Sequence, residues 1–198
     1  DLAVVWTGAD VATDQGDVVA RLTSQIAEGT EFIVPMGERA DPQTVQFGNH
    51  VDTEPVGVLA WEATRIASGI PRIGLDTDAR TIPNEIGLYA THLDKGCYRG
   101  QETVARVHNL GRPPRRLTML MLDGSDAELP DPGASVILEG RKVGQLGGGA
   151  MHHELGPVGL ALLKRNVSVD SVLTVDGVAA SQTILVDPEV GLHVRPQL

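Results

Sequence analysis

The pattern of apolar and polar residues changes character near residue 112. Before that point, apolar residues repeat at helical spacing over 18–26 and again over 56–68, and a glycine follows each stretch. A glycine at that place is typical of a helix end. Ala3–Trp6 and Glu31–Val34 are short apolar runs that favour strands. The mixture of strands and helices predicts an α+β arrangement for this part of the chain.

After residue 112 the chain consists of short apolar runs separated by turn residues. Val172–Val175, for example, is joined to Val178 by Asp176-Gly177, which is a strong hairpin signal. Many short strands at close spacing predict a small antiparallel barrel or sandwich. We therefore divide the chain into residues 1–111, an α+β region, and residues 112–198, a β-barrel domain.

The segment Lys95–Arg106 stands between these two regions and contains Cys97, the chain's single cysteine. Glycines flank this residue, at 96 and 100, and allow a tight loop. Helix-forming residues follow from Gln101 to Asn109, so Cys97 would lie just before a helix N-terminus. The helix dipole, with Lys95 close by, favours a thiolate at that position. The alternative is that Cys97 is an inert, buried apolar residue, as single cysteines usually are.

The charge pattern adds a second candidate feature. The chain has a net charge of −10, which argues against broad attraction to nucleic acid. Residues 95–116 nevertheless contain six basic residues and one acidic residue. This basic segment suggests a specific anion, such as a carboxylate tail, a phosphate or a short stretch of RNA. The alternative is that its arginines pair with acidic groups elsewhere in the fold.

Other features of the sequence carry weaker signals. Gly147–Gly149 is not followed by the residues of a phosphate-binding loop, so we expect these glycines to relieve crowding in a bent barrel strand. His152 and His153 are adjacent, and on a strand they would point to opposite faces, so we expect no metal site. No run is long and apolar enough to span a bilayer. One cysteine forms no internal disulfide, which favours the cytoplasm. The chain begins without a methionine, so we expect a fragment, a processed product or half of a longer protein.

The central stretch resembles the signature of a known family. Lys-Gly-Cys-Tyr-Arg-Gly-Gln-Glu at 95–102, followed by Arg106, is similar to the motif of the YgfZ proteins. These are folate-binding relatives of the glycine-cleavage T protein, an aminomethyltransferase, and they act in maintaining iron–sulfur enzymes and are associated with tRNA modification. Residues 61–66, 82–88 and 159–165 resemble the family as well. The resemblance implies a T-protein-type fold, with α+β subdomains in a ring, followed by the small antiparallel β-barrel.

The resemblance also implies a cofactor and candidate site residues. Tetrahydrofolate or a one-carbon derivative would bind in the ring. Lys95, Cys97 and Tyr98 match signature residues of that pocket, and Cys97 is the candidate reactive thiol. Glu31 resembles the carboxylate with which the T protein binds the pterin, and Arg65 matches a recurring basic position. The family also has an N-terminal segment upstream of the first residue here, which would complete the pocket.

Three functions follow as alternatives. The first is a folate-binding accessory protein for iron–sulfur enzymes, linked to tRNA modification, with these client enzymes as partners. The second is a folate-dependent aminomethyltransferase or demethylase. Cys97 argues against this function, because the T protein has an acidic residue at that position. The third is an RNA-contacting module that uses the basic residues of 112–116. The sequence leaves open whether the protein is an enzyme.

Overall fold

A computed structural model describes residues 57–88, 96–107, 113–124 and 128–189 in full, and the backbone of 108–110 and of five N-terminal strands. The structure divides into two compact units, residues 1–64 and 65–198, and each is described separately. The predicted boundary between residues 111 and 112 lies outside the described residues and stays a prediction.

The N-terminal unit contains a three-stranded antiparallel sheet. Its strands are β1 (Leu2–Thr7), β2 (Ala20–Thr23) and β3 (Thr30–Pro35), in the order β1-β3-β2. A two-stranded ribbon follows, formed by β4 (Gln46–Phe47) and β5 (Val51–Asp52). The predicted helix over 18–26 is wrong where β2 lies, because these residues pair with β3 instead of closing helical hydrogen bonds.

Three helices follow the sheet in the sequence. They are α1 (Val58–Ala67), which spans the boundary between the units, the 3₁₀ helix η1 (Pro83–Ile86) and α2 (Gln101–Leu110). The helices predicted over 56–68 and 101–109 are confirmed to within two residues at each end. Pro83 stands at the first turn of η1, and Gly87 ends it in the left-handed conformation with φ of 76°.

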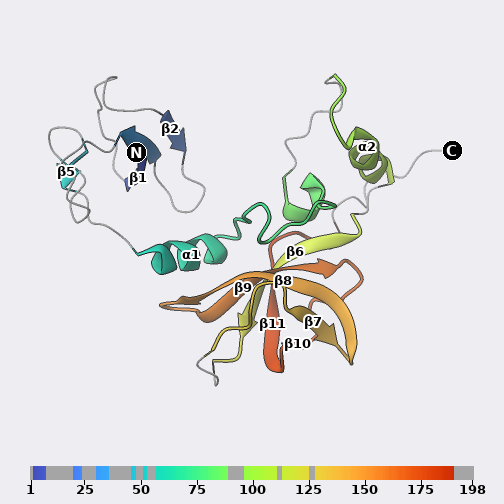
Figure 1. Cartoon of the computed structure of the whole chain (residues 1–198). Helices are drawn as coiled ribbons and strands as arrows, with labels where there is room; N and C mark the ends of the chain where they lie inside the picture. The colour runs from blue at the N-terminus through green and yellow to red at the C-terminus, as the bar shows by residue number, and fades with distance from the viewer. Residues whose placement is uncertain are drawn as a thin grey trace. The chain divides into compact units, whose positions relative to one another are not determined.

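The C-terminal region is a closed antiparallel barrel of six strands (Figure 1). The strands are β6 (Arg115–Leu122), β7 (Ser135–Leu138), β8 (Arg141–His152), β9 (Gly156–Lys164), β10 (Leu173–Val175) and β11 (Val178–Ile184). Around the barrel they follow the order β10-β11-β6-β9-β8-β7. The predicted fold class, α+β elements followed by a small antiparallel barrel, is confirmed.

Local turn chemistry explains two of the barrel's hairpins. Asp176 and Gly177 have φ of 49° and 89°, and Glu139 and Gly140 have φ of 50° and 76°. Two successive left-handed residues make the tight turn whose twist matches that of the flanking strands. The hairpin predicted from Asp176-Gly177 is confirmed, with Val175 opposite Val178.

The barrel is filled by one cluster of buried aliphatic side chains, contributed by all six strands and Val167. Strands β6 and β9 are also buried on their other face, where Leu117, Met119 and Leu160 are at most 6% exposed. The segment 65–88 lies against this part of the barrel, and its η1 packs on β6. The outer face of β6 and β9 is therefore a second buried layer, and η1 covers part of it over β6.

Candidate functional site

The loop that contains Cys97 is fastened to the start of α2 by hydrogen bonds. The Tyr98 N–H donates to Gln101 Oε1 at 3.1 Å, and the Gln101 N–H donates back to the Tyr98 carbonyl at 3.2 Å. Gly100 has φ of 82°, a conformation that favours glycine. Cys97 is an exposed free thiol, and Tyr98 is half-buried. A held loop and an accessible thiol at a helix start are what an anion-binding or thiol-based site would need.

The other predicted site residues are distributed as follows. Lys95 lies outside the described residues. Glu31 lies on β3, the central strand of the N-terminal sheet, opposite Trp6 and Leu22, and its side chain lies outside the described part of the structure. The assignment of Lys95, Cys97, Tyr98 and Glu31 to a folate site stays a prediction.

Arg65 is buried and forms an ion pair that the sequence analysis did not anticipate. Its Nη1 lies 2.8 Å from Asp76 Oδ2, and the exposed fractions of the two side chains are 3% and 0%. The same Asp76 oxygen accepts the Arg72 N–H at 2.7 Å, and Asp76 Oδ1 accepts the Gly148 N–H at 2.6 Å. A buried carboxylate held by an arginine and two amides is a structural anchor. It attaches the segment after α1 to strand β8.

The glycines of β8 explain how this anchor fits. A Cβ at Gly147 would lie 2.7 Å from the Asp76 Cα, and one at Gly148 would lie 2.9 Å from Arg65 Nη2. The pairing of β8 with β9 also shifts register between Leu146 and Gly149. Crowding in an irregular barrel strand was the expected role of these glycines. The structure adds that the crowding neighbour is the Arg65–Asp76 pair.

A second polar cluster holds the start of β6. Arg115 makes two hydrogen bonds to Glu85, both at 2.9 Å, and two to Asp78, at 2.7 and 3.1 Å. The hydrogen bonds that Arg115 donates, to Glu85 first and then to Asp78, raise its pKa above the ordinary value. The Arg115 guanidinium in turn holds the pKa of Asp78 well below its ordinary value of 3.8. Glu85 is buried and also accepts the Ile82 N–H, so it belongs to the fold rather than to an open site.

Arg116 is buried within the same region and has neutral partners. It donates to Thr118 Oγ1, to the Val167 carbonyl at 3.2 Å and to Gln182 Oε1 at 2.8 Å. Burial lowers its pKa. Arg115 therefore pairs with acidic groups elsewhere in the fold, as the alternative to an anion-binding role anticipated, whereas Arg116 is held by neutral groups instead. Arg112 lies outside the described residues.

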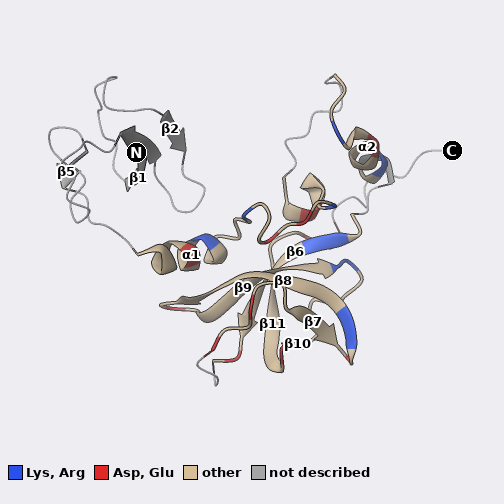
Figure 2. Ribbon diagram, viewed as in Figure 1, with Lys and Arg blue, Asp and Glu red and all other residues tan. Residues whose placement is uncertain are grey.

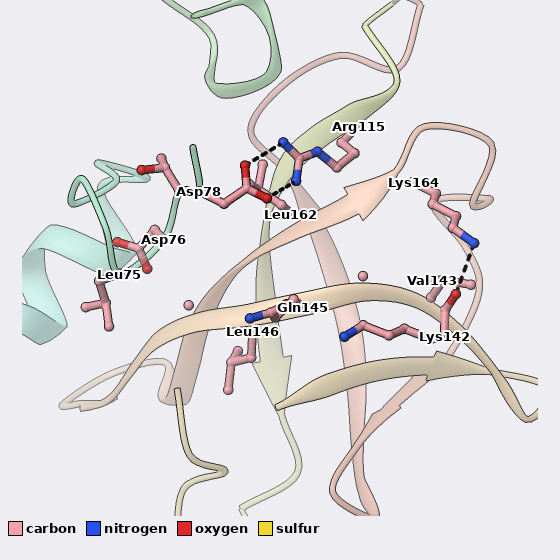
Figure 3. Close-up of a pocket in the computed structure, with 13 residues that line it drawn as sticks. Leu75, Asp76, Asp78, Arg115, Lys142, Val143, Gln145, Leu146, Leu162 and Lys164 are labelled. Atoms are coloured by element: carbon pink, nitrogen blue, oxygen red, sulfur yellow. Dashed lines mark hydrogen bonds and ion pairs between the residues drawn. The ribbon is translucent and has the colours of Figure 1, made fainter. Parts of the chain in front are cut away.

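A groove of about 370 Å³ lies beside these clusters, between residues 75–78 and the outer surface of the barrel (Figure 3). Its apolar surface includes Leu75 and Leu162, and the Asp78–Arg115 pair forms one side. Strand β8 forms the other side, where Lys142 and Gln145 are exposed. Lys164 of β9 completes the rim, and its Nζ donates to the Lys142 carbonyl at 3.1 Å. We call this feature the β8 groove.

The histidine pair lies at the β8–β9 turn. His152 Nδ1 accepts the N–H groups of Glu154 and Leu155 at 3.1 and 3.2 Å, so this nitrogen is used to close the turn. Among the residues that the structure describes, no group of three or more His, Cys, Asp or Glu side chains could hold a metal ion. In the same part of the chain, no helix is long and apolar enough to cross a membrane.

Asp76, Asp78 and Glu85 were not predicted from the sequence as the partners of Arg65 and Arg115. The hydrogen bonds of Arg115 reach residues 30 and 37 positions away, and those of Arg65 and Gly148 to Asp76 span 11 and 72 positions. No local pattern indicates partners at such separations. The alternation of Asp76 and Asp78 in a loop shortly before Pro83 was the one available signal.

Comparison with known proteins relates the chain to one family model and to three kinds of relative. Residues 115–185 match the family model described as the CAF17 C-terminal beta-barrel domain. A putative chloroplastic transferase of Arabidopsis thaliana is 34% identical over 128 residues, which cover 61% of this chain and 28% of that protein. An aminomethyltransferase of Thermotoga neapolitana is 29% identical over 133 residues, covering 66% of this chain and 35% of the enzyme.

The tRNA-modifying protein YgfZ of Escherichia coli is 37% identical over 82 residues, covering 40% of this chain and 24% of that protein. The chain thus spans about a quarter to a third of the length of these curated relatives. The predicted resemblance to the YgfZ proteins and the aminomethyltransferases is confirmed.

Proposed function

Because the chain is a relative of the YgfZ proteins and the aminomethyltransferases and carries the CAF17-type C-terminal barrel, we propose that it belongs to a folate-binding protein. The folate is tetrahydrofolate or a one-carbon derivative. The protein acts as an accessory factor that maintains iron–sulfur enzymes, a role linked to tRNA modification. The names of the relatives support the general class. The folate and the iron–sulfur role are inferred from the resemblance of residues 95–102.

The exposed thiol of Cys97 is the observation that carries this proposal. It lies on a loop that hydrogen bonds fasten to the N-terminus of α2, beside Lys95 in the sequence. A folate has an acidic tail and a pterin rich in hydrogen-bond donors. A lysine at a helix start suits the tail, and a carboxylate such as Glu31 suits the pterin. We assign Cys97 as a reactive thiol next to the bound folate and Tyr98 as part of the pocket wall.

In this proposal, Arg65 has a positioning role. Its guanidinium is occupied by Asp76, so we propose that it positions the chain after α1 instead of touching the ligand. We further propose that a segment upstream of residue 1 contributes to the pocket, that the barrel domain begins at residue 112, and that the protein works in the cytoplasm, where a free thiol is stable.

The test is a tetrahydrofolate titration of the full-length protein. Lys95→Ala is expected to weaken binding by about tenfold or more, because a charge-assisted hydrogen bond is lost. Arg99→Ala is the matched control, since it removes an exposed cation from the same loop. It is expected to change the affinity by less than about threefold. Absence of saturable binding, or equal effects of the two variants, would contradict the proposal.

The alternative function is a folate-dependent aminomethyltransferase or demethylase. The 29% identity to the Thermotoga aminomethyltransferase over 66% of the chain favours it. Cys97, at a position where the T protein has an acidic residue, weighs against it. Turnover of a methylamine donor by the full-length protein with tetrahydrofolate would establish this function. Folate binding without any such turnover would favour the accessory role.

A further inference from the structure

The β8 groove contains positive charges that nothing in the described structure neutralises. Lys142 and Lys164 are exposed on its rim, and neither forms an ion pair with a described carboxylate. On the opposite side, Asp78 is paired with Arg115, and Asp76 is paired with Arg65. The lining contains two carboxylates, Asp76 and Asp78, and three cations, Arg115, Lys142 and Lys164, which gives the groove a net positive charge in a chain whose overall charge is −10.

The arrangement of the strands brings these cations together. Arg115 of β6 lies directly opposite Lys164 of β9, and Lys142 stands near the start of β8. Figure 2 shows Lys and Arg gathered on β6 and towards the ends of the barrel strands. Like charges on directly opposed strands are unfavourable unless they are compensated. Asp78 and Glu85 compensate Arg115, whereas the two lysines lack a described counter-charge.

A hydrogen bond between strands β8 and β9 restrains the Lys164 side chain. The Lys164 ammonium is anchored to the Lys142 carbonyl, which keeps it at the edge of the groove (Figure 3). Gln145 is exposed on the same strand and supplies an amide without a side-chain partner among the described residues. Leu75 and Leu162 give the groove an apolar surface. A few polar groups beside apolar side chains are the usual composition of a small-molecule site.

We propose that the β8 groove binds a small organic anion, with its carboxylate or phosphate group between Lys142 and Lys164. An apolar or aromatic part of the ligand lies against Leu75 and Leu162, and Gln145 offers a hydrogen bond. This site shares no residue with the loop at 95–102, so it is independent of the folate proposal. The Asp78–Arg115 pair forms a fixed wall, because its charges are already paired.

Benzoate and phenyl phosphate are suitable probes, because they share an aromatic ring and differ in the anionic group. Benzyl alcohol has the same ring without the charge. Each is titrated into the protein while backbone amide shifts of residues 142–147 are followed by NMR. At least one anion is expected to give saturable shifts there, and the alcohol is expected to bind several-fold more weakly. The better anion identifies the head group of the natural ligand. Absence of saturable shifts with both anions would overturn the proposal, as would equal binding of the alcohol.

Three variants test the role of the lysines. Lys142→Gln and Lys164→Gln are each expected to weaken anion binding by about fivefold or more, as expected for loss of a charge-assisted contact. Arg141→Gln is the matched control, because Arg141 is exposed on the same strand and does not line the groove. Its effect is expected to stay within about twofold. All three residues are exposed, and unchanged melting temperatures confirm that the variants fold.

An equal loss in Arg141→Gln would show that a diffuse basic surface attracts the anion, and the specific site would be rejected. A short RNA that binds with the same sensitivity to all three substitutions would lead to the same rejection, in favour of a nucleic-acid surface.

Discussion

Replacement of Asp76 by alanine is expected to detach the segment after α1 from the barrel. The carboxylate is completely buried, pairs with Arg65 and accepts the N–H groups of Arg72 and Gly148. Its removal takes the counter-charge from a buried guanidinium and an acceptor from a buried amide. Breaking a buried pair in this way costs about 3–5 kcal/mol, a large share of the 5–15 kcal/mol that is typical of a domain's free energy of unfolding.

Asp78→Ala provides the matched comparison two residues away. Asp78 also pairs with an arginine, at 2.7 Å, but its side chain is 52% exposed. Water screens this pair and can replace it, and Glu85 remains to neutralise Arg115. The expected cost is about 1 kcal/mol or less. The two variants therefore remove the same chemical group from similar pairs that differ in burial.

Urea unfolding at neutral pH measures both losses, provided that the slope of the transition is unchanged. Hydrogen exchange supplies a local measurement, since the Gly148 N–H donates to Asp76. Its protection is expected to fall in Asp76→Ala and to persist in Asp78→Ala. Similar losses of stability in the two variants, or a Gly148 amide that stays protected without Asp76, would refute the assignment of Asp76 as the anchor.

Further predictions concern the same contacts. Gly147→Ala is expected to destabilise the protein by about 1–3 kcal/mol, measured by thermal melting, because the new Cβ would lie 2.7 Å from the Asp76 Cα; a neutral effect would contradict the close approach. Arg115 holds the pKa of Asp78 below 3.8, so this carboxylate stabilises the fold fully above about pH 4 and progressively less as the pH falls. The difference in stability between wild type and Asp78→Asn should therefore shrink in acid, and a constant difference would argue against the pairing. Arg115→Ala is expected to lower the melting temperature rather than to act selectively on RNA binding, because the buried Glu85 would lose its counter-charge; a fully stable variant with weaker RNA binding would reverse this conclusion.

The features predicted well from the sequence are those that depend on neighbouring residues. Asp176-Gly177 forms the expected hairpin because its backbone conformation is set by two adjacent residues. The helix that begins at Gln101 is found because its hydrogen bonds and its link to Tyr98 are local. Cys97 is exposed, so the alternative of a buried thiol is wrong, and the functional interpretation of the loop stays a prediction.

The features that were missed depend on distant contacts. Apolar residues over 18–26 fit a helix and a strand equally well, and pairing with β3 decides for a strand over 20–23. In the sequence, Arg65 and Arg115 are candidate ligand-binding cations. In the structure, each pairs with a carboxylate from a distant loop or short helix. The β8 groove arises only when three strands and residues 75–78 come together.

The most direct measurement for the folate site is the alkylation rate of Cys97 in the full-length protein as tetrahydrofolate is added. If the vitamin binds beside this thiol, iodoacetamide should react more slowly as the site fills, and Lys95→Ala should shift the protection to higher folate concentrations. An alkylation rate that stays constant up to saturating folate would contradict the central claim.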